Sequence, residues 1–192
     1  RDFDIKKTFI LHVRDENYIA SSYLRAATLK NYISSIEMIN KNNFNVIRIV
    51  HPKSEKLSLG KNYSELDISS IENQYFQYFL LKRCKGFICC HSGPGPLGAF
   101  LEASILELNL FPLEFTYALK KNDIYVPKKI KKQNGKLLSY NEIFSSKLKF
   151  VSSKPQMDSR SLIAIENSED EVYESVKEFI RLQDNKSAPL TD

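Results

Sequence analysis

The chain has 192 residues and a mass of 22.2 kDa, with 42% hydrophobic residues and a formal charge of +5. This length and apolar content are enough for a packed core, which excludes a disordered or collagen-like chain. No apolar run approaches the ~18–20 residues that a membrane-spanning helix needs. We expect a single domain over residues 1–183 and a loose tail over residues 184–192.

Basic residues concentrate in one segment, since residues 120–136 hold seven lysines and one aspartate. A local excess of this kind suits an anionic ligand, an anionic membrane surface or simple solubility. No arginine-rich, zinc-finger or aromatic nucleic-acid signature accompanies it. We therefore expect no nucleic-acid partner.

The cysteines and the first residues indicate the compartment and the origin of the chain. Three cysteines, two of them adjacent and with no Cys-x-x-Cys pair, argue against a disulfide framework or a zinc cage and favour a reducing compartment. The chain starts with Arg1 and has no signal-peptide pattern, so we interpret it as a piece of a longer or processed protein. A cytoplasmic location is expected, with contact at the inner face of the membrane as a further option.

The first half of the chain alternates between extended and helical patterns. Aromatic and branched residues predict a strand over residues 7–13 that is buried on both faces. Apolar residues at three- and four-residue steps predict a helix over residues 25–42. Further elements are expected in this order: a strand over 45–50, a short strand near 66–68, a helix over 71–84 and a strand over 86–91.

The second half has weaker patterns. A turn rich in serine, glycine and proline leads from residue 92 into a helix that is expected to end near residue 105. A short strand is predicted over residues 108–112 and a long Lys-rich connection over residues 120–139. Residues 168–183 give the clearest helix, because a capping box opens it.

Strands that alternate with helices predict parallel strands joined by crossovers. The fold class is therefore α/β, with a Rossmann-like open parallel sheet and helices on both faces. Ligands of such sheets bind at the carboxyl ends of the strands, where the strand order reverses. All three histidines fall at such ends: His12, His51 and His91. Ordinary surface or turn positions are the alternative for each of them.

The turn after the predicted strand over residues 86–91 is the strongest physical feature. Its glycines allow a ligand close to the backbone and permit positive φ, and Pro residues suit the first turn of a helix. The helix start presents unpaired N–H groups, so phosphate or pyrophosphate is the natural ligand of Ser92, Gly93 and Gly95. A tight turn without a ligand is the alternative. The pattern is neither a Walker loop nor a dinucleotide fingerprint.

A second candidate pair follows the first predicted strand. His12 and Arg14 point to the same side of a strand, and the planar fork of arginine suits phosphate oxygens. An ion pair of Arg14 with Asp15 or Glu16 on the surface is the alternative. Arg25 either reaches the same region or is solvated at a helix start.

Four blocks of the sequence resemble a family of bacterial glycosyltransferases found with surface-polysaccharide genes. They are FILHVRDENY, YLRAATLKNYISSIEMINKNNFNVIRI, FLLKRCKGFICCHSGPG and DIYVPKKIKK, and they span roughly residues 7–144. The family is similar to GT-B enzymes, and its His-x-Arg motif resembles that of fucosyltransferase-type sequences. A GT-B enzyme has two Rossmann-like halves. The resemblance implies that this chain is the C-terminal, donor-binding half and that an N-terminal acceptor half completes the site.

The resemblance also implies roles for individual residues. Arg14 would contact the diphosphate of a nucleotide-sugar together with His12, and Ser92 and Gly93 would contact phosphate. His91 stands where the family usually has Thr or Ser, and it retains a donor for phosphate. Lys128, in the Val-Pro-Lys block, would approach the donor, whereas a solvated basic loop is the alternative.

The expected function is transfer of a sugar from a nucleotide-sugar to a glycan or lipid-linked acceptor. Arg14 and helix-start amides would stabilise the charge that grows on the departing diphosphate, so neither a cofactor nor a metal is expected. His12 is a candidate base or an orienting group. The alternative is a non-catalytic nucleotide- or phosphate-binding regulatory module. An epimerase or phosphatase would need an acidic cluster, and only Asp15 and Glu16 are available.

Overall fold

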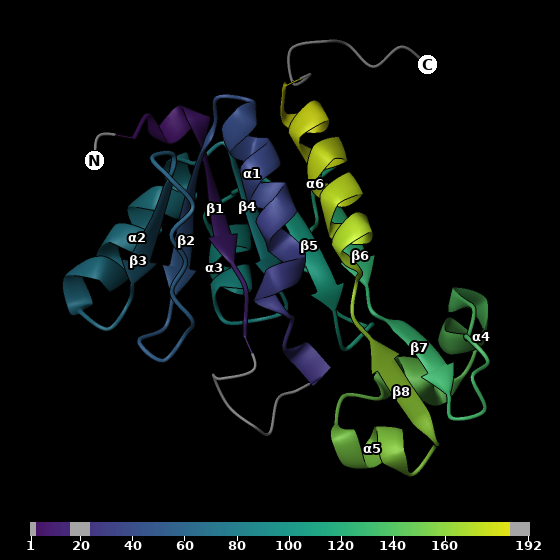
Figure 1. Ribbon diagram of the computed structural model, residues 1–192. Coiled ribbons are helices and arrows are strands. Elements are labelled where there is room, and N and C mark those ends of the chain that lie inside the picture. Colours follow the sequence, from purple (N-terminus) through teal and green to yellow (C-terminus); the bar gives the residue numbers. More distant parts are fainter. Residues whose placement is uncertain (1–2, 16–23, 185–192) are drawn as a thin grey trace.

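The computed structural model describes residues 3–15 and 24–184 (Figure 1). Its centre is a six-stranded parallel sheet in the order β3-β2-β1-β4-β5-β6, which confirms the Rossmann-like class. The strands are β1 (Thr8–His12), β2 (Asn45–Val50), β3 (Tyr63–Asp67), β4 (Gly86–Cys90), β5 (Ile105–Leu110) and β6 (Ile124–Pro127).

Helices cover both faces of this sheet, as expected. One face packs against α1 (Ile33–Lys41) and α6 (Glu169–Asp184) through a core that includes Phe9 and Leu11 of β1. The other face packs against α2 (Ile71–Arg83) and α3 (Pro94–Phe100) through a core that includes Ile10. Neighbouring residues of β1 therefore point into opposite cores, which explains why the strand is apolar throughout.

Two predicted helices differ from the structure at their ends. The helix expected over residues 25–42 begins later, because residues 29–32 form a 3₁₀ turn, η3 (Leu29–Tyr32), ahead of α1. The helix expected to end near residue 105 ends at Phe100, and Glu102 then adopts a φ of 62°. A left-handed residue stops a helix, so the chain enters β5 three residues earlier than the strand predicted over 108–112.

The prediction of a long connection over residues 120–139 is wrong. This segment contains β6 and then β7 (Lys129–Lys132), which pairs antiparallel with β8 (Leu162–Ile165). Ile130 of β7 is buried between exposed or half-buried lysines, so the strand has period-2 alternation that its lysines disguise. Helices α4 (Tyr140–Phe144) and α5 (Lys154–Asp158), with the 3₁₀ turn η4 (Lys147–Phe150), lie near this small sheet (Figure 1).

The two ends of the described chain lie near a short 3₁₀ turn before β1 and at the last residue of α6. A 3₁₀ turn, η1 (Ile5–Lys7), leads into β1. Asp184 ends α6, and the remainder of the tail expected over residues 184–192 lies outside the described residues, as does Glu16. None of the helices over residues 3–15 and 24–184 has the length and apolar character needed to cross a membrane.

Candidate functional site

The strand order reverses between β1 and β4. From β1 the chain continues to β2 and β3 on one side, and it later returns to β4, β5 and β6 on the other side. β1 and β4 are hydrogen-bonded neighbours, with His12 level with Cys89. The loops that follow these two strands run in opposite directions. They leave a crevice at the edge where ligands of such sheets bind.

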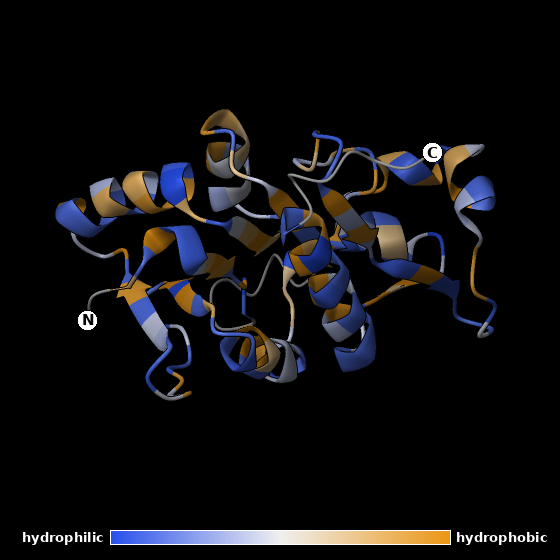
Figure 2. Cartoon of the chain, turned by 90° about the horizontal axis from the view of Figure 1, so that it is seen from above, coloured by the Kyte–Doolittle hydropathy of each residue, from blue (hydrophilic) through white to orange (hydrophobic). Residues whose placement is uncertain are grey.

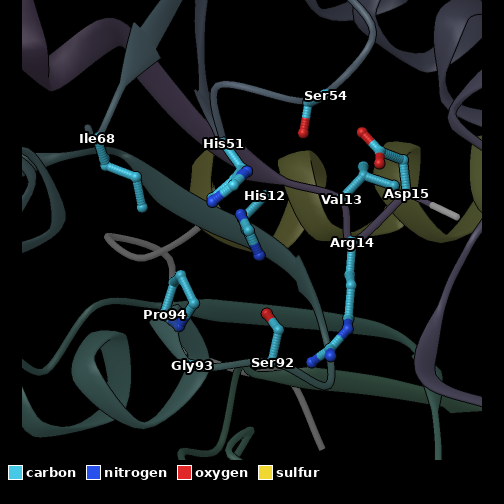
Figure 3. A pocket seen from close by; sticks show the side chains of 10 residues that line it. All are labelled: His12, Val13, Arg14, Asp15, His51, Ser54, Ile68, Ser92, Gly93 and Pro94. Carbon is cyan, nitrogen blue, oxygen red and sulfur yellow. The ribbon is translucent and has the colours of Figure 1, made fainter. Parts of the chain in front are cut away.

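A pocket of about 110 Å³ lies in this crevice (Figure 3). It is lined by residues from the ends of β1, β2, β3 and β4, namely His12, Val13, Arg14, Asp15, His51, Ser54, Ile68, Ser92, Gly93 and Pro94. Four of the predicted site residues, His12, Arg14, Ser92 and Gly93, thus meet in one pocket. Each of them lies at or just after the end of a strand, where ligands of such sheets bind.

His12 is half-buried at the end of β1, and its Nδ1 lies 3.3 Å from the backbone oxygen of Ile49. Since a carbonyl oxygen only accepts, Nδ1 carries the proton of this hydrogen bond and Nε2 keeps a lone pair. Burial, together with the positive charges of Arg48 and Arg14, lowers the pKa of His12 from 6.5 to about 4. His12 is therefore neutral at pH 7 and acts there as a hydrogen-bond acceptor.

The backbone of Arg14 is anchored by two hydrogen bonds, one at its N–H and one at its carbonyl. Its N–H donates to the Sγ of Cys90 at 3.0 Å, and its carbonyl accepts from the N–H of Ala27 at 2.9 Å. The first contact joins the end of β1 to β4, and the second ties it to the segment before α1. The guanidinium therefore emerges from an anchored backbone into the pocket, toward the side where Ser92 lies (Figure 3).

The turn after β4 provides small groups at the floor of the pocket. Ser92 is buried, and its hydroxyl donates to the carbonyl of Cys90 at 3.1 Å. Gly93 precedes α3 with helical dihedrals, φ −50° and ψ −42°, and a Cβ built on it would meet no atom within 4 Å. The space beside Gly93 is therefore open to a ligand. Positive φ is not what requires a glycine there.

The next two glycines are explained by packing. A Cβ on Gly95 would collide with the ring of Tyr117, and one on Gly98 would lie 2.6 Å from Cδ1 of Phe87. Gly95 does not line the pocket. The structure thus separates Gly93, which faces open space, from Gly95 and Gly98, which let α3 sit close to its neighbours.

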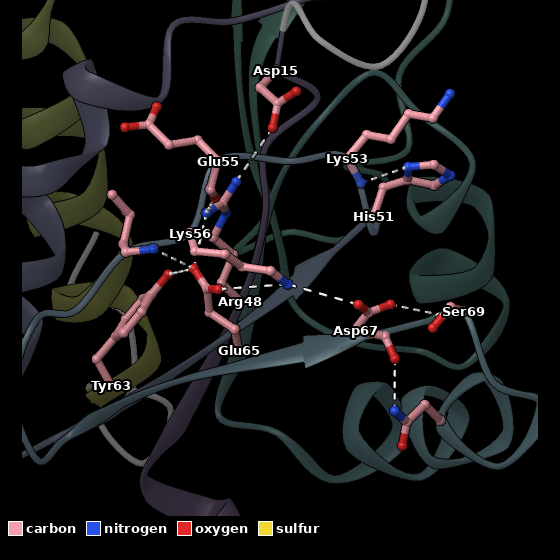
Figure 4. Close-up of polar contacts among 12 residues, drawn as sticks. Asp15, Arg48, His51, Lys53, Glu55, Lys56, Tyr63, Glu65, Asp67 and Ser69 are labelled. Atoms are coloured by element: carbon pink, nitrogen blue, oxygen red, sulfur yellow. Dashed lines mark hydrogen bonds and ion pairs between the residues drawn. The ribbon is translucent and has the colours of Figure 1, made fainter.

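A buried ion-pair network supports the β1 side of the pocket (Figure 4). The guanidinium of Arg48, on β2, is fully buried and lies 3.5 Å from a carboxylate oxygen of Asp15 and 3.0 Å from one of Glu65. It also donates to the backbone oxygen of Glu55 at 2.7 Å. The hydroxyl of Tyr63 donates to Glu65 at 2.7 Å, and burial together with this carboxylate raises the pKa of Tyr63. Asp15 is therefore engaged in the support of the pocket.

Arg25 and His91 lie in a second pocket, on the other side of the end of β4. This pocket has a volume of about 410 Å³ and is lined by Leu24, Arg25, His91, Pro112, Phe115, Ser152, Ser153, Lys154 and Pro155. It therefore combines two cations, an exposed aromatic ring and two serine hydroxyls. The expectation that Arg25 joins Arg14 in one pocket is not met, because the two arginines line separate pockets.

His91 belongs to a buried cluster with Glu107 of β5. Its Nδ1 lies 2.9 Å from Oε1 of Glu107, and its ring stacks on that of Tyr117 with centroids 4.8 Å apart. The other oxygen of Glu107 accepts from the hydroxyl of Thr116 and from the N–H of Tyr117, both at 2.8 Å. These partners fix the His91 ring. Glu107 was not predicted, although a lone acid inside the apolar strand ILELNL signals a buried charge that needs partners.

Lys128 lies outside both pockets. It is buried, and its ammonium donates to the backbone oxygen of Ala26 at 2.7 Å. The alternative of a solvated basic loop is therefore wrong at this position. The predicted approach of Lys128 to the donor stays a prediction, since Lys128 lines neither pocket. Lys128 instead ties the residue after β6 to the segment that carries Arg25.

Over residues 3–15 and 24–184, no three His, Cys, Asp or Glu side chains are grouped so that they could hold a metal ion.

Comparison with solved structures finds this fold in glycosyltransferases. ADP-heptose LPS heptosyltransferase II of E. coli aligns with a TM-score of 0.59 and 13% identity, over 96% of this chain and 49% of its own. A family 9 glycosyl transferase from Veillonella parvula gives 0.52 and 10%, over 92% and 47%. The heptosyltransferase TibC, in complex with ADP-D-β-D-heptose, gives 0.53 and 9%, over 92% and 46%.

These alignments cover about half of each of the three solved chains. The expected likeness to a glycosyltransferase is thus supported at the level of the fold, whereas the fucosyltransferase-type motif stays a prediction. No protein-family model and no curated protein sequence matches the chain.

Proposed function

We propose that this chain is the nucleotide-sugar-binding half of a glycosyltransferase. The observation that carries the proposal is the convergence of His12, Arg14, Ser92 and Gly93 in one pocket at the reversal of the strand order. The fold shared with family 9 glycosyltransferases supports it. Two of these neighbours are an ADP-heptose transferase and a heptosyltransferase bound to an ADP-heptose, so an ADP-linked sugar is the first donor to test.

The diphosphate lies in the smaller pocket in this proposal. The guanidinium of Arg14 offers paired N–H donors to phosphate oxygens, and the open side of Gly93 lets phosphate approach the backbone. During transfer, the bond between the anomeric carbon and the diphosphate oxygen breaks, and the acceptor hydroxyl forms the new bond. Arg14 then stabilises the charge that remains on the diphosphate.

His12 orients a hydroxyl in this scheme. Its pKa of about 4 makes His12 a weak base. It is therefore a poor acceptor for the proton that the acceptor hydroxyl loses. Its neutral ring, fixed by the hydrogen bond to Ile49, instead accepts a hydrogen bond through Nε2. The general base then comes from the acceptor half of the complete enzyme.

The nucleoside occupies the larger pocket beside His91. A volume of about 410 Å³ falls within the range of small-molecule sites. Phe115 supplies an aromatic ring for the base, and Arg25 supplies positive charge toward the diphosphate. Lys154, at the rim of the same pocket, is ion-paired with Asp158 at 2.7 Å. Both pockets adjoin the turn of residues 91–94, so one extended nucleotide-sugar reaches from one to the other.

Thermal unfolding in the presence of ADP, GDP, UDP, CMP and dTDP tests the binding. A nucleotide at about 100 times its dissociation constant adds about 2.7 kcal/mol to the stability of the folded state, or roughly 5–11 °C in Tm for a chain of this size. We expect one nucleotide to give such a shift. Arg14→Ala abolishes it, whereas Arg160→Ala, at an exposed arginine outside both pockets, retains it. A shift that survives in Arg14→Ala refutes the site.

A nucleotide-binding module without catalysis is the second candidate. It is favoured by the pKa of about 4 of His12, which makes the predicted catalytic histidine a weak base. Sugar transfer from the bound nucleotide-sugar to a glycan or lipid-linked acceptor, measured with the complete protein, separates the two. Release of the nucleoside diphosphate with transfer supports the enzyme, and binding without turnover supports the module.

A further inference from the structure

Helix α2 carries an apolar surface that is unusual for the outer side of a helix. Ile71 is 59%, Tyr75 is 70% and Phe79 is 51% exposed, and Phe76 and Tyr78 on the same helix are exposed too. The inner side of α2 packs into the core through Leu80 and Leu81. Figure 1 places the helix at the periphery, next to the edge strand β3, and Figure 2 shows apolar bands along it. Single exposed apolar residues are ordinary, whereas a contiguous aromatic patch indicates an interaction site.

The patch has an ordered charge pattern. Glu72, Phe76, Phe79 and Arg83 follow each other at four-, three- and four-residue steps, so they form one row along the helix. The rings of Phe76 and Phe79 stack with centroids 5.9 Å apart and an interplanar angle of 12°. Along the helix the row therefore consists of an acid, two aromatic residues and a base. The half with Glu72 and Phe76 is complementary in charge to the half with Phe79 and Arg83.

From this pattern we infer that α2 pairs with α2 of a second copy of the chain. In an antiparallel pair with a two-fold axis at the middle of the row, Glu72 faces Arg83 of the partner subunit, and Phe76 faces Phe79 of the partner subunit. The same axis places Arg83 of this chain opposite Glu72 of the partner subunit, and Phe79 of this chain opposite Phe76 of the partner subunit, as a two-fold interface requires. The aromatic rings fill the centre and the two ion pairs close the ends, which is the usual arrangement of an interface.

The charges favour a second copy over an unrelated partner. Neither Glu72 nor Arg83 forms an ion pair within the described part of the chain, whereas the adjacent Lys82 is paired with Glu102 at 3.1 Å. An inverted copy of the row places a base opposite the acid and an acid opposite the base, so a second copy satisfies both charges at once. None of these residues lines either pocket at the reversal of the strand order, so pairing leaves those pockets open. Phe76 and Phe79 also line a groove of about 330 Å³ beside α2, together with Phe3 and Leu66, and this groove lies within the proposed interface.

Sedimentation equilibrium of the 192-residue chain over a range of concentrations tests the pairing. We expect a monomer–dimer equilibrium below about 100 μM that weakens as salt screens the ion pairs. Tyr75→Glu, which places a charge in the exposed patch, raises the dissociation constant of the dimer at least about tenfold. Glu37→Arg, at an exposed glutamate on α1, leaves it unchanged. A chain that stays monomeric at all these concentrations refutes the inference and leaves a different protein as the occupant.

Charge exchange between two copies gives the sharper test. Glu72→Arg and Arg83→Glu each place like charges opposite one another in a homodimer, so each variant alone is expected to be monomeric. An equimolar mixture of the two restores opposite charges at both ends and sediments as a dimer. Unchanged Tm of each variant shows that the chain still folds. Dimers of either single variant, or a mixture that stays monomeric, overturn the antiparallel arrangement.

Discussion

At the scale of single residues, the position of a residue along its strand predicted whether it lines the pocket better than its residue type did. His12, Arg14, Ser92 and Gly93 line one pocket because each lies at or just after the end of a buried strand, and parallel strands end at one edge of the sheet. Gly95 was also predicted to bind phosphate, but it does not line the pocket and packs against Tyr117 instead. This contact could not be predicted, because Tyr117 is 22 residues away in the sequence. Lys128 was assigned by resemblance alone, and a tertiary hydrogen bond to Ala26 explains its burial.

The lowered pKa of His12 makes the stability of the protein depend on pH. Unfolded His12 binds a proton below about pH 6.5 and folded His12 only below about pH 4, so stability falls as the pH drops between these values. We expect the free energy of unfolding to fall by about 1–3 kcal/mol more in the wild type than in His12→Asn between about pH 7 and about pH 4. Urea unfolding of both proteins at the two pH values measures this difference. Equal losses contradict the burial of a neutral imidazole.

The network around Arg48 holds the strand ends in place. In Arg48→Met the carboxylates of Asp15 and Glu65 lose their buried counter-ion, and we expect a loss of about 3–5 kcal/mol in the free energy of unfolding. Arg160→Met, at an exposed arginine, changes it by no more than about 0.5 kcal/mol. Urea denaturation compares them, and a loss below about 1 kcal/mol for Arg48→Met shows that the network does not support the fold.

At the scale of elements, buried apolar runs were predicted well and tertiary contacts were not. β2 begins and ends where expected, because its residues are apolar on both faces apart from Asn45 at its start and Arg48. The start of α1 was misplaced, since the N–H of Ala27 donates to the carbonyl of Arg14 and Thr28 is extended, with ψ 114°. β7 was missed because lysines surround its single buried isoleucine, Ile130.

The glycines around α3 give a matched pair of variants. In Gly98→Ala the new methyl group would lie 2.6 Å from the buried ring of Phe87, so overpacking is expected to cost about 1–3 kcal/mol of stability. In Gly93→Ala the methyl group meets open space at a helical φ, so the change stays within about 1 kcal/mol and is neutral or stabilising. Thermal unfolding distinguishes the two. Equal losses would show that α3 does not pack on β4 as described.

At the scale of the whole molecule, the two proposals concern two different surfaces. The carboxyl edge of the strands carries both pockets, and the acceptor half of a glycosyltransferase would face this edge in the proposed enzyme. The outer side of α2 carries the aromatic row and lies at the periphery of the sheet (Figure 1). The fold class followed from the sequence because strand and helix patterns alternate. Neither the division of the site into two pockets nor the self-complementary row was predicted, because both depend on which side chains the fold leaves exposed.

The central claim is that a nucleoside diphosphate binds between the ends of β1 and β4. A two-dimensional amide NMR titration with ADP, or with the nucleotide that raises Tm most, locates the binding directly. The account predicts that the largest shifts fall on the amides of residues 12–15 and 91–93, with smaller shifts at Arg25 and Phe115. Shifts confined to the groove of Phe3, Leu66 and Phe76 beside α2, or no shifts at saturating nucleotide, would contradict it.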